Sequence, residues 1–375
     1  MMRLGDVATY INGFAFKPDD WSEEGLPIIR IQDLTGNSYQ MNRYAGDYNP
    51  KYEVNRGDVL ISWSASLGVY VWQGEKALLN QHIFKVIFDK CDVDKSFYVH
   101  QVAAILEKAA SQAHGATMKH LTKPVFDALP FYLPDLPTQQ RIADTLDKVA
   151  EGIEVCRKML GELDLMVKAK FVEMFGDPVS NPMGWEEKKL GHVCKKLTDG
   201  THFSPESFAT GAYKYVTAKN IRINGFDFSN ITYIPEEVHR PIYERCNPEY
   251  GDVLYIKDGV TTGIAMVNTL HEEFSLLSSV ALLKQDRNVI NGCFLCGVLN
   301  NAEMYSNIRM NMGGAAITRL TIAKLNEIRV IVPPIELQEQ FATFVSKIDK
   351  SRLTIQQVLS KIELEQKVLM QKYFG

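Results

Sequence analysis

The sequence predicts an α+β protein with a pseudo-twofold internal repeat: two similar mixed α/β domains separated by two long antiparallel coiled-coil-like helices. Three observations lead to this prediction. The chain of 375 residues is longer than one ordinary hydrophobic core sustains. Its second half repeats its first half. Each half ends in a stretch whose apolar residues recur at the heptad spacing of packed helices.

The repeat is clearest in residues 115–176 and 314–375, which align without a gap. The first copy begins with GATMKHL and the second with GAAITRL, and both copies end in Phe-Gly. Gln139 aligns with Gln338, and Pro134 aligns with Pro333. Upstream the match is looser: LGDVATYINGFAF resembles LGHVCKKLTDGTHF, and RGDVLIS resembles YGDVLYIK. The order of parts is therefore domain, helix, domain, helix.

Both helical stretches carry an apolar seam with alternating spacings of four and three residues, interrupted in the second copy by Arg352 and Gln366. Such a seam needs a partner helix, so we expect the two helices to pack on each other. The first carries the chain to the second domain and the second returns, which predicts an antiparallel pair roughly 50 Å long at ~1.5 Å per residue. The predicted seam residues are Ile142, Leu146, Val149, Ile153, Cys156, Leu160, Leu163, Val167, Phe341, Val345, Ile348, Ile355, Leu359 and Ile362.

These patterns predict the domain boundaries. We expect a first domain at residues 1–133, a first spacer helix with its linker at 134–185, a second domain at 186–332 and a second spacer helix at 333–375. Within each domain, short strand-like runs such as GDVLIS and GDVLYI are separated by Gly, Asn and Asp turns, and a helical segment follows them.

Composition and charge exclude several classes of protein. The net charge of −4 argues against a protein that coats nucleic acid by bulk electrostatics, so any DNA-binding surface must be local. No apolar run approaches the roughly 20 residues of a membrane span, and the N-terminus MMRLGDVATY lacks the features of a signal peptide. The six cysteines form no disulfide framework. We expect a cytoplasmic protein with no membrane contact.

Catalytic motifs are absent from both halves. The sequence holds no G-x-G-x-x-G after a strand and no G-x-x-x-x-G-K-[ST], the loops that cradle nucleotide phosphates. Cys293 and Cys296 form a single C-x-x-C without the second ligand pair that a zinc site needs, which favours two buried thiols on one helix. We therefore predict no catalytic residues, no cofactor and no metal, and a chain with two binding domains.

Two domains on a helical spacer suit a split DNA site. Duplex DNA repeats every ~34 Å, and dimeric readers contact two half-sites on one face. Since the two domains differ in sequence, their half-sites would differ too. Polar turn residues are the candidates for contact, because Arg and Lys pair with guanine, Asn and Gln with adenine, and Ser, Thr and Lys hold phosphates. The candidates are Arg30, Gln32, Asn37, Ser62, Trp63, Ser64, Ser66 and Lys119 in the first domain, and Thr217, Lys219, Asn220, Arg222, Lys257, Thr261, Thr262 and Arg319 in the second.

The whole pattern resembles the specificity subunit of type I restriction-modification systems. The resemblance is carried by GATMKHLTKPVFDALPFYLPDLPTQQRIADTLD and GAAITRLTIAKLNEIRVIVPPIELQEQFATFVSKID, with NRGDVLISWSASLG and EYGDVLYIKDGVTTG as a second matched pair. It implies that each domain is a target recognition domain reading one half of a bipartite, asymmetric sequence in double-stranded DNA. It also implies a non-catalytic chain that docks two methyltransferase subunits and, through them, the restriction and translocase subunits used in phage defence.

Three alternatives to this reading stay open at the level of sequence. The chain could be an enzyme whose motif is unusual, which would show turnover in isolation. It could be a protein scaffold whose domains do not bind DNA, and its assembly would then be insensitive to salt. It could also be the specificity chain of another methylation-based phage-defence system.

Overall fold

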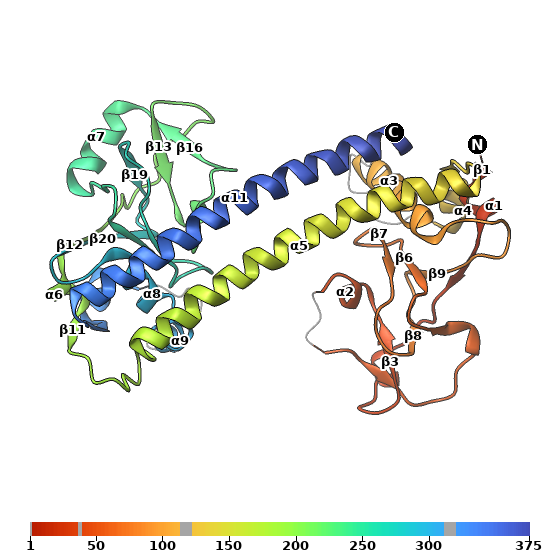
Figure 1. Cartoon of the computed structure of the whole chain (residues 1–375), viewed down its shortest axis with the longest axis horizontal. Helices are drawn as coiled ribbons and strands as arrows, with labels where there is room; N and C mark the ends of the chain where they lie inside the picture. The colour runs from red at the N-terminus through yellow and green to blue at the C-terminus, as the bar shows by residue number, and fades with distance from the viewer. Residues whose placement is uncertain (1, 37–39, 113–121, 311–319) are drawn as a thin grey trace. The chain divides into compact units, whose positions relative to one another are not determined.

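The computed structural model covers the chain and describes residues 2–36, 40–112, 122–310 and 320–375. It divides into two compact units. The first unit comprises Met1–Arg157 and Gln357–Gly375, and the second comprises Lys158–Gln356. Each unit therefore contains a continuous globular part together with a segment of each long helix. The chain segments of Figure 1 can be followed by their labels and colours.

The first unit is built around two four-stranded sheets. One is fully antiparallel, with strand order β2-β9-β6-β7, and the other has order β4-β3-β8-β5 and includes a parallel pair, β3 with β8. A short antiparallel pair, β1 with β10, joins the two ends of the globular part. The elements are β1 (Met2–Arg3), α1 (Leu4–Val7), β2 (Thr9–Asn12), β3 (Leu26–Ile29), α2 (Ile31–Leu34), β4 (Arg43–Tyr44), β5 (Glu53–Val54), β6 (Val59–Ser62), β7 (Gly68–Val71), β8 (Ala77–Leu79), β9 (Ile83–Ile87), α3 (Lys95–Gln112), α4 (Lys123–Asp127) and β10 (Pro130–Phe131).

The second unit repeats this plan. Its four-stranded antiparallel sheet has order β12-β20-β17-β18, and its second sheet has order β16-β13-β19 with β13 and β19 parallel. The elements are β11 (Glu187–Lys189), α6 (Leu190–Val193), β12 (Cys194–Asp199), β13 (Tyr213–Val216), η3 (Ala218–Asn220), β14 (Ile221–Arg222), β15 (Gly225–Phe226), β16 (Thr232–Ile234), α7 (Glu236–Arg245), β17 (Val253–Ile256), β18 (Ala265–Val267), β19 (Phe274–Leu276), β20 (Val280–Gln285), α8 (Gly292–Leu299), α9 (Ala302–Met310), α10 (Ile322–Glu327) and β21 (Arg329–Ile331).

Local differences between the units have simple physical causes. A register shift between Cys194 and Lys196 in β12 accommodates one extra residue, because Gly200 follows the end of α6 by seven positions whereas Gly13 follows the end of α1 by six. The single helical segment expected after β20 is two helices, because the Asn301 side chain accepts hydrogen bonds from the backbone of Glu303 and Met304 and starts α9. Helix α7 is an element of the second unit that the first unit replaces with a short 3₁₀ turn at Pro50–Tyr52.

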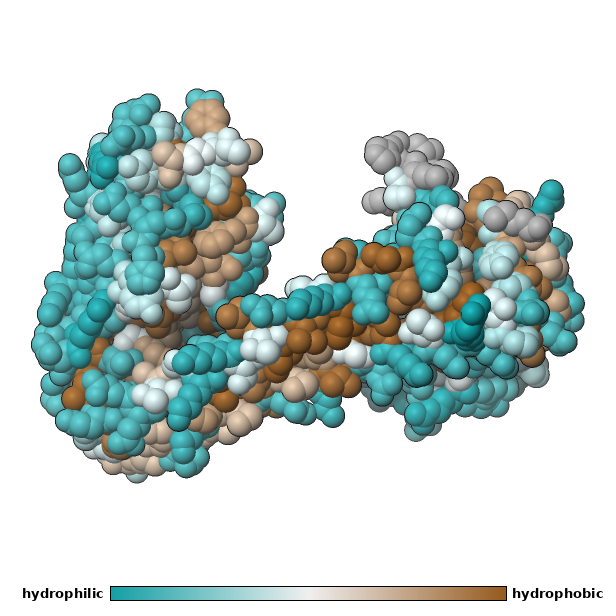
Figure 2. All heavy atoms as spheres, turned by 45° about the horizontal axis from the view of Figure 1, so that its top comes forward, coloured by the Kyte–Doolittle hydropathy of each residue, from teal (hydrophilic) through white to brown (hydrophobic). Residues whose placement is uncertain are grey.

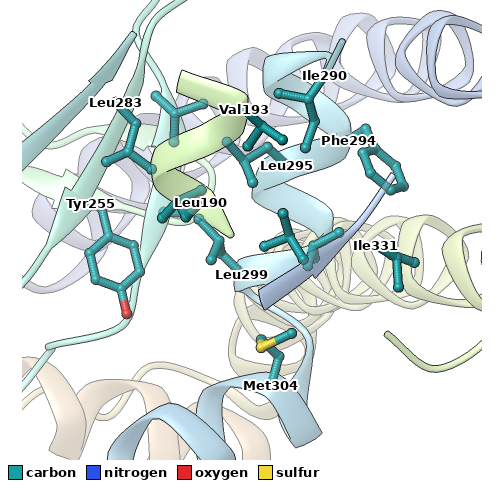
Figure 3. Close-up of a cluster of buried hydrophobic side chains, with 14 of the residues drawn as sticks. Leu190, Val193, Tyr255, Leu283, Ile290, Phe294, Leu295, Leu299, Met304 and Ile331 are labelled. Carbon is teal, nitrogen blue, oxygen red and sulfur yellow. The ribbon is translucent and has the colours of Figure 1, made fainter. Parts of the chain in front are cut away.

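The core of the second unit lies between its antiparallel sheet and the helices around it (Figure 3). Leu190 and Val193 of α6 meet Leu283 of β20, and Phe294 and Leu295 of α8 point into the same cluster. All five side chains are fully buried. Burial of such side chains stabilises a fold by about 1.5–3 kcal/mol each.

The C-x-x-C pair lies beside this core. Cys293 and Cys296 are free thiols on α8, as expected. Burial raises the pKa of the Cys293 thiol to about 12 and raises the pKa of Cys296 well above its usual value. Neither thiol is therefore a ready nucleophile or metal ligand near neutral pH.

The long helices α5 (Leu136–Phe175) and α11 (Ile335–Phe374) each begin in one unit and end in the other. In the first unit, Arg157 Nη2 of α5 lies 2.8 Å from Glu363 Oε1 of α11. In the second unit, Arg352 Nη1 of α11 lies 2.6 Å from Asp164 Oδ1 of α5, and the rings of Phe171 and Phe341 are 5.5 Å apart. In that unit, residue numbers rise along α5 as they fall along α11, so the two segments run antiparallel (Figure 1).

All the predicted seam positions are buried or partly buried. Leu165 and Leu353, which lie off the seam, are 64% and 57% exposed. Arg352, expected as a polar interruption, is buried but ion-paired with Asp164, so its charge is compensated.

A buried glutamine fastens the start of each long helix to its unit. Gln139 Oε1 accepts a hydrogen bond from the Asp94 backbone N–H, and its Nε2 donates to the Pro134 carbonyl, both at 2.8 Å. Asp94 in turn accepts from the Phe97 backbone at the start of α3. The glutamine thus ties the first turn of α5 to the residue that caps the neighbouring helix.

Gln338 makes the equivalent contacts in the second unit. Its Oε1 accepts from the Asn291 backbone N–H at 2.8 Å, and its Nε2 donates to the Pro333 carbonyl at 2.8 Å. Asn291 caps α8 through its side chain. The alignment of Gln139 with Gln338 in the sequence therefore corresponds to one structural role used twice.

Replacing Gln139 should destabilise the first unit. Gln139→Leu removes the side-chain partner of the partly buried Asp94 N–H and Pro134 carbonyl, so we expect the free energy of unfolding to fall by roughly 1–3 kcal/mol. The matched control is Gln140→Leu, because Gln140 is the exposed neighbour on the same helix turn; its effect should stay within about 0.5 kcal/mol. Urea denaturation of both variants measures the difference, and equal stability of the two would contradict the fastening role.

Candidate nucleic-acid interface

The candidate contact loops of the first unit leave from a junction between its two sheets. Strand β2 ends at Asn12, and Gly13 and Phe14 then cross to the second sheet. A side chain at position 13 would lie 2.0 Å from the Asn80 carbonyl oxygen, so only glycine fits there. Backbone hydrogen bonds close the crossing, namely Gly13 N to Ile83 O, Phe14 N to Leu79 O, Gln81 N to Phe14 O, Asn80 N to Ile29 O and Trp63 N to His82 O.

The second unit repeats this junction bond for bond. Gly200 follows β12, and a side chain on it would lie 1.9 Å from the Leu276 carbonyl oxygen. The equivalent backbone hydrogen bonds are Gly200 N to Val280 O, Thr201 N to Leu276 O, Ser278 N to Thr201 O, Leu277 N to Val216 O and Lys257 N to Ser279 O. The two units therefore hold their loops on the same backbone frame.

Side chains on this frame differ between the units. In the first unit, Trp63 Nε1 donates to Asn12 Oδ1 at 3.2 Å, and the indole packs against His82 and Phe84 with ring centroids 4.9 and 5.6 Å away. In the second unit, the position equivalent to Trp63 is Lys257, and the position equivalent to Asn12 is Asp199. An aromatic and amide contact is thus replaced by an ion pair.

Lys257 is 1% exposed and sits between two carboxylates. Its Nζ lies 3.0 Å from Asp258 Oδ2 and 3.4 Å from Asp199 Oδ2. Asp199 also faces two further basic groups, with Arg245 Nη2 at 3.6 Å and His202 Nε2 at 3.1 Å from its Oδ1. This buried charge network closes the base of the loop that follows β17.

The loop after β17 is held at several points. Gly259 and Gly263 have φ values of +101° and +111°, which side chains strongly disfavour. The Thr262 hydroxyl donates to the Gly259 carbonyl at 2.6 Å. Arg309 of α9 donates to the carbonyls of Val260 and Thr262, both at 3.3 Å. The tip of this loop is therefore presented to solvent on a fixed backbone.

The loop after β13 combines buried and exposed polar groups. Asn220 is buried, where its Oδ1 accepts from the Thr217 backbone at 3.0 Å and its Nδ2 donates to the Asp227 carbonyl at 3.1 Å. Lys219 and Arg222 are exposed, and Arg222 Nη2 pairs with Asp227 Oδ2 at 2.8 Å. Asn220 thus shapes the loop, and the two basic side chains face solvent.

In the first unit, Arg30 is half-buried with its guanidinium carbon 5.3 Å from the centroid of the Trp21 ring, and Gln32 is exposed on α2. Ser62 is buried and its hydroxyl donates to the Ser66 carbonyl, while Ser66 itself is exposed.

The structure sorts the predicted contact residues by exposure. Exposed ones are Gln32, Ser66, Lys219, Arg222 and Thr261; partly buried ones are Arg30, Trp63 and Thr217; buried ones are Ser62, Ser64, Asn220, Lys257 and Thr262. Asn37, Lys119 and Arg319 lie outside the described residues.

Sequence reasoning missed three residues that organise the second unit's loops. Asp199 lies close to Lys257, Arg245 and His202. Val260 forms the tip of the loop after β17, and Arg309 donates a hydrogen bond to the Val260 carbonyl. Aligning TDG at 198–200 with ING at 11–13 could have pointed to Asp199. The contact of Arg309 with the loop has no local sequence signal, because 49 positions separate it from Val260.

Within the part of the chain that the structure describes, no group of three or more His, Cys, Asp or Glu side chains could hold a metal ion. A separate search of the described helices finds none that is both long and apolar enough to cross a bilayer.

The two units define a protein with a tandem pair of similar α+β domains. Each domain has its own loop junction of the same backbone design, and the side chains on the junction differ between the two domains. A family model described as "Type I restriction modification DNA specificity domain" matches the chain twice, over residues 1–164 and 182–366. The chain belongs to this family of type I restriction-modification specificity proteins. This confirms the predicted family, the two-domain α+β architecture and the predicted function of sequence-specific DNA recognition.

Individual relatives agree with this assignment. The chain is 22% identical over 410 residues to the type I restriction enzyme EcoBI specificity subunit of Escherichia coli, covering 100% of this chain and 85% of that protein. It is 20% identical over 366 residues to the MjaVIII specificity subunit of Methanocaldococcus jannaschii, covering 93% of this chain and 85% of that protein.

Solved structures share the fold. The S subunit of a type I restriction-modification system from M. genitalium matches with a TM-score of 0.58 at 16% identity, covering 100% of this chain and 95% of that chain. A chain from a structure of complex assembly and conformational transition of the type I system matches with a TM-score of 0.53 at 17% identity, covering 100% and 96%.

The buried lysine provides a stability test. Lys257→Met removes the buried cation between Asp199 and Asp258 and leaves only the more exposed Arg245 and His202 beside Asp199, so we expect the free energy of unfolding to fall by roughly 1–3 kcal/mol. Lys219→Met is the control on the neighbouring loop, where an exposed lysine should contribute no more than about 0.5 kcal/mol. Denaturation curves of the two variants decide the matter; a Lys257→Met protein as stable as Lys219→Met would show that the network is dispensable.

Proposed function

We propose that this chain reads a bipartite, asymmetric DNA sequence, with one half-site for each domain, and that it has no catalytic activity of its own. The observation that carries the proposal is the shared loop junction, which appears once in each unit with different side chains. One backbone frame supplies one way of approaching DNA, and different side chains on it supply different sequence preferences. Two such domains in one chain then specify two unlike half-sites.

Exposed polar side chains near the junctions are the proposed contacts. In the second domain these are Lys219, Arg222 and Thr261, and in the first domain Gln32 and Ser66. Arg30, Trp63 and Thr217 would contribute through their exposed parts. For the buried residues Ser62, Ser64, Asn220, Lys257 and Thr262, we propose a role in shaping these loops, because their polar atoms face the protein interior.

The long helices are proposed to act as an antiparallel spacer, with recognition domains at 1–133 and 186–332 and spacer helices at 134–185 and 333–375. Support comes from the burial of the seam residues, from the ion pair between the two helices in the first unit and from the antiparallel contacts of the two segments in the second unit. In this arrangement the length of the paired helices sets the number of base pairs between the half-sites.

We further propose that the helices dock two methyltransferase subunits and, through them, restriction and translocase subunits, in the cytoplasm. Both helices expose apolar side chains on the segments within each unit, which fits a surface for other proteins (Figure 2). These residues are Leu136, Val155, Val358, Leu364 and Val368 in the first unit, and Met159, Leu165, Met166, Val172 and Leu353 in the second. The repeat of the surface suits two copies of one partner.

Mapping of methylated adenines tests the function directly. Cells that express the chain with its genomically neighbouring methyltransferase are compared with cells that lack only this chain. We expect a split, asymmetric motif that appears only when the chain is present. A double variant, Lys219→Ala with Arg222→Ala, should relax one half of the motif and leave the other half intact. Unchanged methylation without the chain would overturn the proposal.

The spacer is tested by removing one heptad from each helix. Gly152 lies near Ile362 in the first unit and Asp164 pairs with Arg352 in the second, so residues 154–160 and 355–361 form matching heptads. Deleting both shortens the spacer by about 10 Å. We expect the gap between half-sites to shrink by about three base pairs at ~3.4 Å per pair, with both half-sites unchanged. Altered half-sites in the methylation map would contradict the spacer role.

A further inference from the structure

Val260 is the most exposed large apolar side chain among the described residues, at 91%. A single exposed apolar residue is common on protein surfaces and by itself carries no meaning. This one, however, forms the tip of the loop after β17 in the second unit, beside Thr261, which is predicted to contact DNA. The role of Val260 is therefore inferred from the residues that hold its loop in place.

The contacts of the loop after β17 hold the Val260 side chain in solvent. Arg309 donates to the Val260 carbonyl, and its guanidinium is fixed by the Tyr305 hydroxyl at 2.7 Å. A side chain at position 263 would lie 2.4 Å from the Tyr305 ring, so Gly263 lets the loop pack closely on α9. Below the tip, Lys257 anchors the loop through its buried ion pairs. A fixed backbone loses little conformational freedom on binding, which favours a specific contact.

The equivalent loop of the first unit presents different chemistry. It runs from Trp63 to Leu67, with Ala65 at a φ of +58° and Ser66 exposed at its tip. The Ser62 hydroxyl bonds to the Ser66 carbonyl and holds that tip. The corresponding loop of the second unit, residues 257–263, is two residues longer and presents the isopropyl group of Val260 at its tip, whereas the loop of the first unit presents a hydroxyl.

Among the groups that DNA displays in its grooves, the C5 methyl of thymine is the one that an aliphatic side chain recognises. Side chains that wedge between base steps from the minor groove are longer or bulkier, such as Phe, Leu, Ile, Met and Pro. Valine is short and β-branched, and Gly259 beside it adds no side chain that would block close approach. The neighbouring Thr261 hydroxyl is available for a polar contact.

We infer that Val260 contacts the C5 methyl group of one thymine in the half-site read by the second domain, and so makes that domain selective for thymine at this position. The inference rests on the proposed DNA-reading function and names the chemical group that one residue reads. It also predicts that the first domain, whose shorter loop exposes Ser66 instead of a valine, reads no methyl group through this loop.

Deoxyuridine scanning tests the contact, because deoxyuridine lacks only the C5 methyl group of thymidine. The complex of this chain with its methyltransferase partner is titrated with duplexes that carry the mapped site, with each thymine replaced in turn. For the wild type we expect one position in the second half-site where the replacement weakens binding about fourfold, the amount expected for one buried methyl-sized group.

Val260→Ala should weaken binding to the normal duplex and reduce the effect of deoxyuridine at that position, because the shorter side chain loses most of its contact with the methyl group; thermal unfolding should stay unchanged since the side chain is exposed. Val125→Ala is the matched control, because Val125 is a half-exposed valine on α4 that lies outside the proposed contacts, and it should leave the deoxyuridine effect in the second half-site intact. Equal deoxyuridine effects in the wild type and Val260→Ala at every position would overturn the inference and leave the DNA-reading function standing. Failure of the wild-type complex to prefer the mapped site would overturn both.

Discussion

The crossing between the two sheets of each unit is the constraint on which the rest of the recognition surface depends. At Gly13 and at Gly200 the backbone passes so close to the neighbouring strand that a Cβ atom would lie 2.0 or 1.9 Å from a carbonyl oxygen. This close approach lets the chain leave one sheet and pair with the other without a gap in its hydrogen bonding. The ends of β2, β6 and β8 in the first unit, and of β12, β17 and β19 in the second, are thereby brought together. Loops that are far apart in sequence therefore begin close together in space in each unit, because the backbone at Gly13 or Gly200 passes directly beside the neighbouring strand.

The junction backbone has the same hydrogen bonds in both units, but the side chains that close it differ between them. In the first, Trp63 and Asn12 close the junction through an aromatic cluster and one hydrogen bond. In the second, Lys257 and Asp199 close it through buried charges. A buried ion pair stabilises a fold less than well-packed apolar groups do, but leaving one partner alone is very costly. Substitutions of Lys257 or Asp199 at the base of the loop are therefore expected to destabilise the second unit, whereas substitutions of the exposed residues at the loop tip should leave its stability unchanged.

Much of the scaffold could be predicted from the sequence, because its determinants are local or repeated. The heptad seams, the paired glutamines and the GDVL strands recur in both halves, and repetition makes a weak pattern readable. The structure gives Gln139 and Gln338 equivalent partners in their two units, as their alignment suggested. The split of one expected helix into α8 and α9 was missed because the cap of Asn301 competes with helix continuation only in the folded context.

The contact surface was less predictable for a different physical reason. A run of polar residues in a turn does not reveal which side chains face solvent, since that depends on partners supplied by distant strands. Lys257 looks like a phosphate contact in the sequence, but Asp199, 58 residues away, draws it into the interior. Val260 is an apolar residue in a polar loop and carries no signal of DNA contact in the sequence, although the fold that buries the lysine holds the valine in solvent. The buried Lys257 and the exposed Val260 thus both follow from the geometry of one loop. The polarity of a residue in the sequence therefore does not predict whether its side chain is exposed for a contact with DNA.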